Sequence, residues 1–159
     1  MNVPNVSLTA GQAVRAILLS GLIAGTLDIT AACVNAGWKG ISPLRVWQSV
    51  ASGLLGRASY QGGTRTALLG LLCHFIIATG AAATYFAASR HLPWLTTRAV
   101  VCGLLYGVAV YFFMNLVVLP LSAYPGKVSF PLGALVTGLL IHMFCVGLPI
   151  ALTVRRFSP

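Results

Sequence analysis

Five polar side chains lie inside stretches of the sequence that are otherwise apolar. They are Asp28, His74, Tyr111, Asn115 and His142, and Asp28 is the only acidic residue among 159. Placing an aspartate in the middle of a membrane span costs about 3 kcal/mol, so Asp28 must face protein or water and needs a partner. Histidine changes charge near neutral pH, and an Asp–His pair in a low dielectric titrates as a coupled unit. The sequence therefore predicts an intramembrane polar centre of these five residues, suited to handling protons.

The same residue types allow other interpretations. Asp28, His74 and His142 are suitable metal ligands, and the two histidines also suit a haem, but no tight spacing such as HxxxH is present. Nucleophilic catalysis is not favoured, because no G-x-S-x-G motif accompanies Asp28. In a further interpretation the carboxylate only fixes the helix register through hydrogen bonds, which in membranes are worth about 0.6 kcal/mol each. We predict no cofactor, no metal ion and no catalytic residue.

The composition is that of an integral membrane protein. Hydrophobic residues make up 58% of the chain and charged residues only 7%, whereas a soluble domain carries about 25% charged residues. The mean hydropathy is +0.91. The formal charge of +9 comes from lysines and arginines beside or between the apolar runs. This placement favours contact with anionic lipid headgroups over nucleic acid.

Four apolar runs are long enough to cross a bilayer, which takes about 20 residues. They cover residues 13–34, 66–88, 99–119 and 131–154. The predicted fold class is therefore an all-α integral membrane protein with four transmembrane helices. Together with one interfacial helix, they form a single membrane domain over residues 1–159.

The interfacial helix is predicted at residues 43–56, between the first two spans. Ser42 is a good N-cap, and proline at position 43 suits the first helical residue. Leu44 and Leu54 belong to its apolar side, whereas Gln48 and Ser52 belong to the opposite, polar side. A helix of this length is too short to span, so we expect it to lie in the membrane interface with Trp47 as an anchor.

Glycines recur on the predicted spans and indicate where helices approach one another. Small residues let helix backbones come close in a membrane. The glycines concerned are Gly21, Gly25, Gly70, Gly103, Gly107 and Gly138. Intramolecular packing is the favoured interpretation of the two G-x-x-x-G pairs, and a homodimer face is the alternative.

An internal repeat accompanies these glycines. Residues 21–26 (GLIAGT) match 103–108 (GLLYGV), and residues 70–75 (GLLCHF) match 138–143 (GLLIHM). The matching spans point the same way, so the repeat is parallel. It places His74 and His142 about 13 to 17 Å deep from the same membrane face, at 1.5 Å per residue. Asp28 and Asn115 lie in the same half of the bundle.

The basic residues are divided evenly between the two sides of the predicted topology. We assign both termini to the cytoplasm, because the arginines on that side are concentrated in a short turn and a short tail beside span ends. Two groups of segments are similar to a family of small four-span bacterial inner-membrane proteins with no assigned function: 51–57 (ASGLLGR) with 62–63, and 107–115 (GVAVYFFMN) with 119–124 (LPLSAY). The resemblance implies a bacterial plasma-membrane location and transfers no catalytic residue.

Two functional hypotheses follow from the sequence. The first is a small proton-linked or permease-like protein that uses the intramembrane Asp/His centre. The alternative is a non-catalytic accessory or scaffold subunit of a membrane complex, and a haem- or metal-binding membrane protein is a third possibility. The expected partners are the lipid bilayer, with its anionic headgroups, and further copies of the chain or a larger membrane complex.

Overall fold

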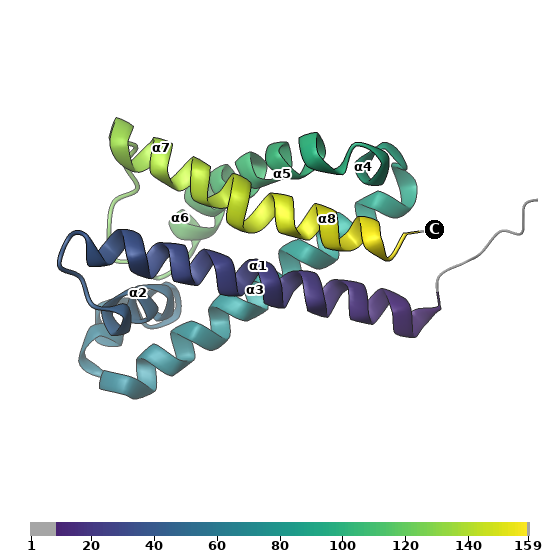
Figure 1. Ribbon diagram of the computed structural model, residues 1–159. Helices are drawn as coiled ribbons and strands as arrows, with labels where there is room; N and C mark the ends of the chain where they lie inside the picture. The colour runs from purple at the N-terminus through teal and green to yellow at the C-terminus, as the bar shows by residue number, and fades with distance from the viewer. Residues whose placement is uncertain (1–8, 159) are drawn as a thin grey trace, which may run out of the picture.

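The computed structural model describes residues 9–158, and four long helices dominate it (Figure 1). All four are long and apolar enough to cross a membrane, which is consistent with a multi-pass membrane protein and confirms the predicted all-helical class. The first two are α1 (Ala10–Gly37) and α3 (Gly63–His91). The third consists of α5 (Ala99–Phe113), η2 (Met114–Val118) and α6 (Leu119–Leu121). The fourth consists of α7 (Leu132–Ile141), η3 (His142–Gly147) and α8 (Leu148–Arg156).

The long helices extend beyond the apolar runs that predicted them, because polar residues at their ends continue the helical backbone. At the start of α1, the Thr9 hydroxyl accepts a hydrogen bond from the Gln12 amide, and the Gln12 side chain accepts one from the Thr9 amide. This capping box satisfies two amide groups that have no partner inside the helix. In the predicted turn after α3, a short helix α4 (Trp94–Thr97) was not foreseen.

The third long helix does not end before Pro120, as the sequence predicted, but continues to Leu121. A proline inside a helix lacks the amide that bonds to the carbonyl four residues back. Here the preceding segment η2 is π-helical, and the Leu119 amide bonds to the Met114 carbonyl, five residues back. Segment η3 does the same before Pro149, where the Leu148 amide bonds to the Met143 carbonyl. A wider turn thus accommodates each Leu-Pro pair within a continuous helix.

The helix between the first two long helices is present as α2 (Pro43–Leu55), with Ser42 as its N-cap. The bundle buries residues from both sides of this helix, and Ala51 of the apolar side is fully buried. Gln48 and Ser52 are almost fully buried, whereas Leu44 and Leu54 are exposed. The Gln48 amide donates hydrogen bonds to the Gly63 carbonyl and the Thr66 hydroxyl, both at the start of α3. The buried Gln48 amide is therefore satisfied by α3.

The helices divide the bundle into two different halves. An apolar core fills the half where α1 begins and α8 ends, which lies on the right in Figure 1. It is built around the buried side chains of Tyr85, Phe86, Ile150 and Val154. Tyr85 and Tyr106 contact each other edge to face, and their hydroxyls donate hydrogen bonds to the Leu95 and Ala81 carbonyls. The other half, where α2 joins the bundle, holds the polar residues.

Candidate functional site

Three ionisable side chains from three different long helices line one cavity of about 190 Å³. Asp28 comes from α1, His74 from α3 and His142 from the first position of η3. The other lining side chains are apolar: Ala24, Val50, Ile77, Ala78, Ala81, Val110, Met114 and Val146. Val50 belongs to α2, so the inserted helix closes one wall of the cavity. The structure thus brings together three of the five residues of the predicted centre.

Each histidine is held by a backbone carbonyl and not by the carboxylate. His74 Nε2 lies 2.8 Å from the Gly25 carbonyl oxygen, and His142 Nδ1 lies 2.9 Å from the Gly138 carbonyl oxygen. A carbonyl only accepts, so each of these nitrogens carries the hydrogen. In the neutral ring the other nitrogen, Nδ1 of His74 and Nε2 of His142, is free to accept a proton. Within residues 9–158, neither ring hydrogen-bonds to Asp28.

Tyr111 and Asn115 do not line the cavity. The Asn115 amide donates a hydrogen bond of 2.8 Å to the Tyr111 carbonyl, one turn earlier on the same long helix. The Tyr111 ring packs edge to face on His142, with 5.2 Å between the ring centroids. A Cβ placed on Gly138 would meet the same tyrosine ring. Tyr111 therefore packs against the His142 ring, and the Asn115 side chain bonds to a backbone carbonyl near the end of α5.

The glycines of both G-x-x-x-G pairs lie at contacts between helices of this chain. A Cβ on Gly21 or Gly25 would meet α3 at Thr79 or Phe75. A Cβ on Gly103 or Gly107 would meet the fourth long helix. On the fourth long helix, Gly147 lies at the same contact. A Cβ added to it would overlap the backbone of both α5 glycines. Gly25 thus lies against α3, which carries His74, and Gly107 lies against η3, which carries His142.

Gly70 differs from its counterpart in the repeat because of the inserted helix. A Cβ on Gly70 would overlap the Trp47 carbonyl of α2, whereas Gly138 faces the Tyr111 ring. Gly70 lets α2 pack directly on α3, one turn before His74. The repeat therefore describes how α1 meets α3 and how α5 meets the fourth helix, but it does not extend to α2.

No family model matches the chain, and no curated protein or solved structure is significantly similar to it. The function must therefore be argued from the site. In the described part of the chain, no group of three His, Cys, Asp or Glu residues is arranged to hold a metal ion. The cavity thus contains a carboxyl group and two imidazoles, but these three groups are not arranged as ligands of one metal ion.

Sequence reasoning missed the apolar groove that adjoins the cavity. The groove has a volume of about 580 Å³ and lies between α3 and the third long helix. It shares four lining residues with the cavity: Ile77, Ala81, Val110 and Met114. Gly80, Thr84 and Ala109 are exposed along it, and Tyr106 bridges the two helices. The cavity and the groove thus share one wall on the side of α3 and α5.

Proposed function

We propose that the chain is a small proton-linked or permease-like protein of the bacterial inner membrane, with an intramembrane centre at Asp28, His74 and His142. The observation that carries the proposal is the shared cavity, to which three helices each contribute one ionisable side chain. Ionisable residues inside a membrane are costly and commonly mark proton or solute pathways. Helix packing alone does not require three ionisable side chains in one apolar cavity, and this supports a role in proton or solute movement.

Charge balance limits the states of this centre. No lysine or arginine lines the cavity, so only a histidine can neutralise an ionised Asp28 there. An unpaired ion in an apolar cavity costs several kcal/mol. The favoured states therefore hold one proton, either on the carboxyl group with neutral imidazoles or on one imidazole beside the carboxylate. In both states the centre carries no net charge, and the two states differ in which group holds the proton.

The groove supports a lateral route to the centre. In the proposed orientation its apolar walls face lipid, and it shares four lining residues with the cavity. A membrane-dissolved solute with a small polar or protonatable group reaches Asp28 from the bilayer along this route. Its apolar part stays in the groove.

A lipid-soluble carbodiimide tests this route, because it reacts with protonated carboxyl groups and Asp28 is the only acidic side chain. We expect modification of Asp28, measured by mass spectrometry of the peptide that contains Asp28, because the terminal carboxyl group can also react. Gly80→Phe should slow it several-fold, since Gly80 lines the groove and a Cβ there has no neighbour within 4 Å. Gly133→Phe is the matched control, because its Cβ is equally free. Equal rates in both variants, or modification by a water-soluble carbodiimide alone, contradict the lateral route.

The proposed topology places both termini in the cytoplasm. Arg90, Arg98, Arg155 and Arg156 then lie beside helix ends on the cytoplasmic side, as the positive-inside rule favours. A Ser158→Cys variant, in a chain whose four native cysteines are replaced by serine, should resist a membrane-impermeant thiol reagent added to intact cells with a permeabilised outer membrane. It should react once the inner membrane is opened. Reaction in intact cells reverses the assigned orientation.

A further inference from the structure

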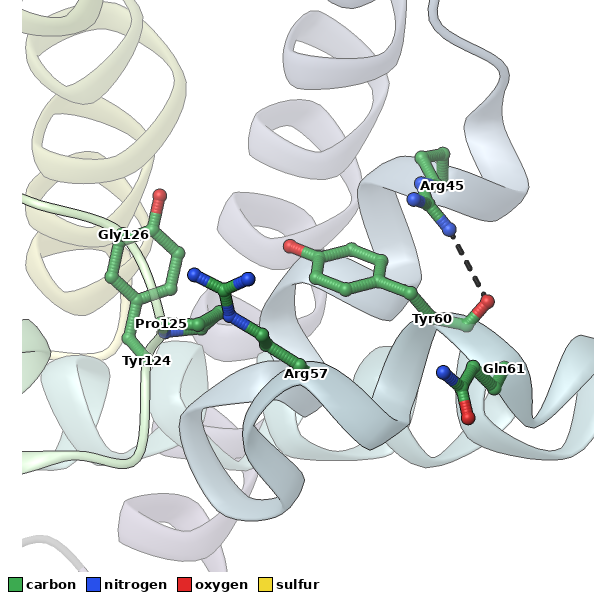
Figure 2. A pocket seen from close by; sticks show the side chains of 7 residues that line it. All are labelled: Arg45, Arg57, Tyr60, Gln61, Tyr124, Pro125 and Gly126. Atoms are coloured by element: carbon green, nitrogen blue, oxygen red, sulfur yellow. Dashed lines mark hydrogen bonds between the residues drawn. The ribbon is translucent and has the colours of Figure 1, made fainter.

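A second cavity, of about 460 Å³, lies at the end of the bundle away from the core and is separate from the Asp28 cavity. Its walls come from two segments far apart in the sequence, the α2–η1 region and the loop that follows α6. The 3₁₀ helix η1 spans Gly56–Gln61. The lining residues are Arg45, Arg57, Tyr60, Gln61, Tyr124, Pro125 and Gly126 (Figure 2). We call this cavity the arginine cleft.

The arginine cleft has a positive charge that the chain itself cannot neutralise. The sequence holds ten lysines and arginines and one acidic residue. That residue, Asp28, lines the other cavity. The carboxyl terminus follows α8, whose end lies at the opposite end of the bundle (Figure 1). An anion that balances Arg45 and Arg57 must therefore come from another molecule.

The cleft is preorganised by contacts within each wall and between them. Arg45 Nη1 donates a hydrogen bond of 3.2 Å to the Tyr60 carbonyl, and its guanidinium carbon lies 4.2 Å from the centre of the Tyr60 ring. The Ala123 amide donates a hydrogen bond of 2.9 Å to the Gly53 carbonyl, which ties the loop to α2. Arg45 is thus fixed before any ligand arrives, so less side-chain entropy is lost on binding.

Local backbone geometry positions Arg57 and Tyr124 in the cleft. Gly56 has φ +59°, a left-handed conformation that favours glycine, and it turns the chain sharply from α2 into η1. Arg57 follows directly and extends into the cleft between Tyr124 and Tyr60 (Figure 2). The Tyr124 ring packs over Gly126, where a Cβ would lie 2.6 Å from the ring. Two guanidinium groups, two phenols and the Gln61 amide therefore surround one opening.

We propose that the arginine cleft binds a phosphate ester. Guanidinium groups present paired N–H donors that match phosphate oxygens, and hydrogen bonds between charged groups are about twice as strong as neutral ones. Phenol and amide groups supply further donors. The phosphate belongs either to the headgroup of an anionic phospholipid or to a soluble molecule. Exposed Leu54 and Leu55 of α2 lie close in sequence to Arg57 and suit the apolar part of a lipid.

Ligand-induced thermal stabilisation of the purified full chain in an uncharged detergent tests this proposal, because a ligand that binds only the folded state raises the Tm. The probes are dioctanoyl phosphatidic acid, dioctanoyl phosphatidylcholine, glycerol 3-phosphate and inorganic phosphate. We expect phosphatidic acid to stabilise the protein more than phosphatidylcholine does. Stabilisation by phosphatidic acid alone assigns the cleft to a lipid headgroup. Equal stabilisation by glycerol 3-phosphate or inorganic phosphate assigns it to a soluble phosphate.

Arg57→Gln should weaken binding of the effective probe at least about tenfold, the loss expected for one charge-assisted hydrogen bond. Arg57 is exposed, so this variant should fold normally, whereas Arg45→Gln also removes the bond to Tyr60. Arg65→Gln is the matched control, since it removes the same charge from the first turns of α3 outside the cleft. Stabilisation by none of the probes, or equal losses in the Arg57 and Arg65 variants, overturns the proposal. The readout needs no proton-linked activity, so it is independent of the Asp28 centre.

Discussion

Gly107→Leu should lower the free energy of unfolding by about 3 kcal/mol, the upper end of what overpacking usually costs. A Cβ at this position would overlap the His142 carbonyl and lie 2.6 Å from the Met143 Cα. Both neighbours are backbone atoms, so no side-chain rotation can relieve the contact. The leucine must push α5 away from η3. It thereby displaces the helix turn that positions His142.

A graded series in detergent, followed by thermal unfolding, measures this effect. Gly25→Leu should cost less than Gly107→Leu, because its nearest neighbours are the Phe75 ring and the Ala78 Cβ, of which the ring can move. Gly80→Leu should cost nothing and can stabilise the helix, since a Cβ there meets no atom within 4 Å and glycine is a poor helix former. A wild-type Tm for Gly107→Leu rules out the close approach of α5 and η3.

Asp28→Asn should preserve the fold and abolish proton-linked activity. The amide keeps the volume and a hydrogen-bonding group but cannot titrate. Since no lysine or arginine lines the cavity, loss of the charge should leave the Tm unchanged or raise it. Infrared difference spectra identify the group directly, because the carboxyl band that disappears in the variant can only come from Asp28, the sole acidic side chain.

Activity is measured as proton flux into vesicles containing the reconstituted protein, with a trapped pH-sensitive dye. His74→Gln and His142→Gln should reduce the flux unequally, because the two rings leave different nitrogens free toward the cavity. His91→Gln is the matched control, because it makes the same change at the exposed last residue of α3, outside the cavity. If all three cavity variants are stable and fully active, the proton-linked proposal fails. The accessory-subunit alternative then becomes the leading hypothesis.

Several features of this protein follow from the sequence because their causes are local. The lengths of the apolar runs specify four long helices, and Ser42 followed by Pro43 specifies where α2 begins. The isolated acidic residue indicates a polar site. Helical rise alone places Asp28, His74 and His142 in the same half of the bundle, because depth along a helix depends only on the number of residues from its end.

The inward faces of the helices were decided by the tertiary structure. Large apolar residues such as Leu18, Leu72 and Leu105 are exposed, whereas Gln48 and Ser52 are buried. In a soluble protein, water would favour the opposite arrangement. Lipid is as apolar as leucine, so hydrophobicity does not distinguish the protein interior from the lipid-facing surface, and close packing of small residues decides instead. The position of α2 against Gly70 was therefore not predictable from its amphipathic pattern.

The arginine cleft and the pairing of Tyr111 with His142 also depend on long-range contacts. Arg57 and Tyr124 come from segments 67 positions apart in the sequence, and a hydrogen bond from the Ala123 amide to the Gly53 carbonyl joins these segments. The π-helical segments were only partly predictable from the sequence. Each Leu-Pro pair indicates that the regular hydrogen bonding of the helix is interrupted, but not whether the helix ends there or continues through a wider turn. In both helices the segment before the proline widens, and the helix continues past it. The sequence thus determined the helices and the depth of their polar groups, and helix packing determined which of those groups share a cavity.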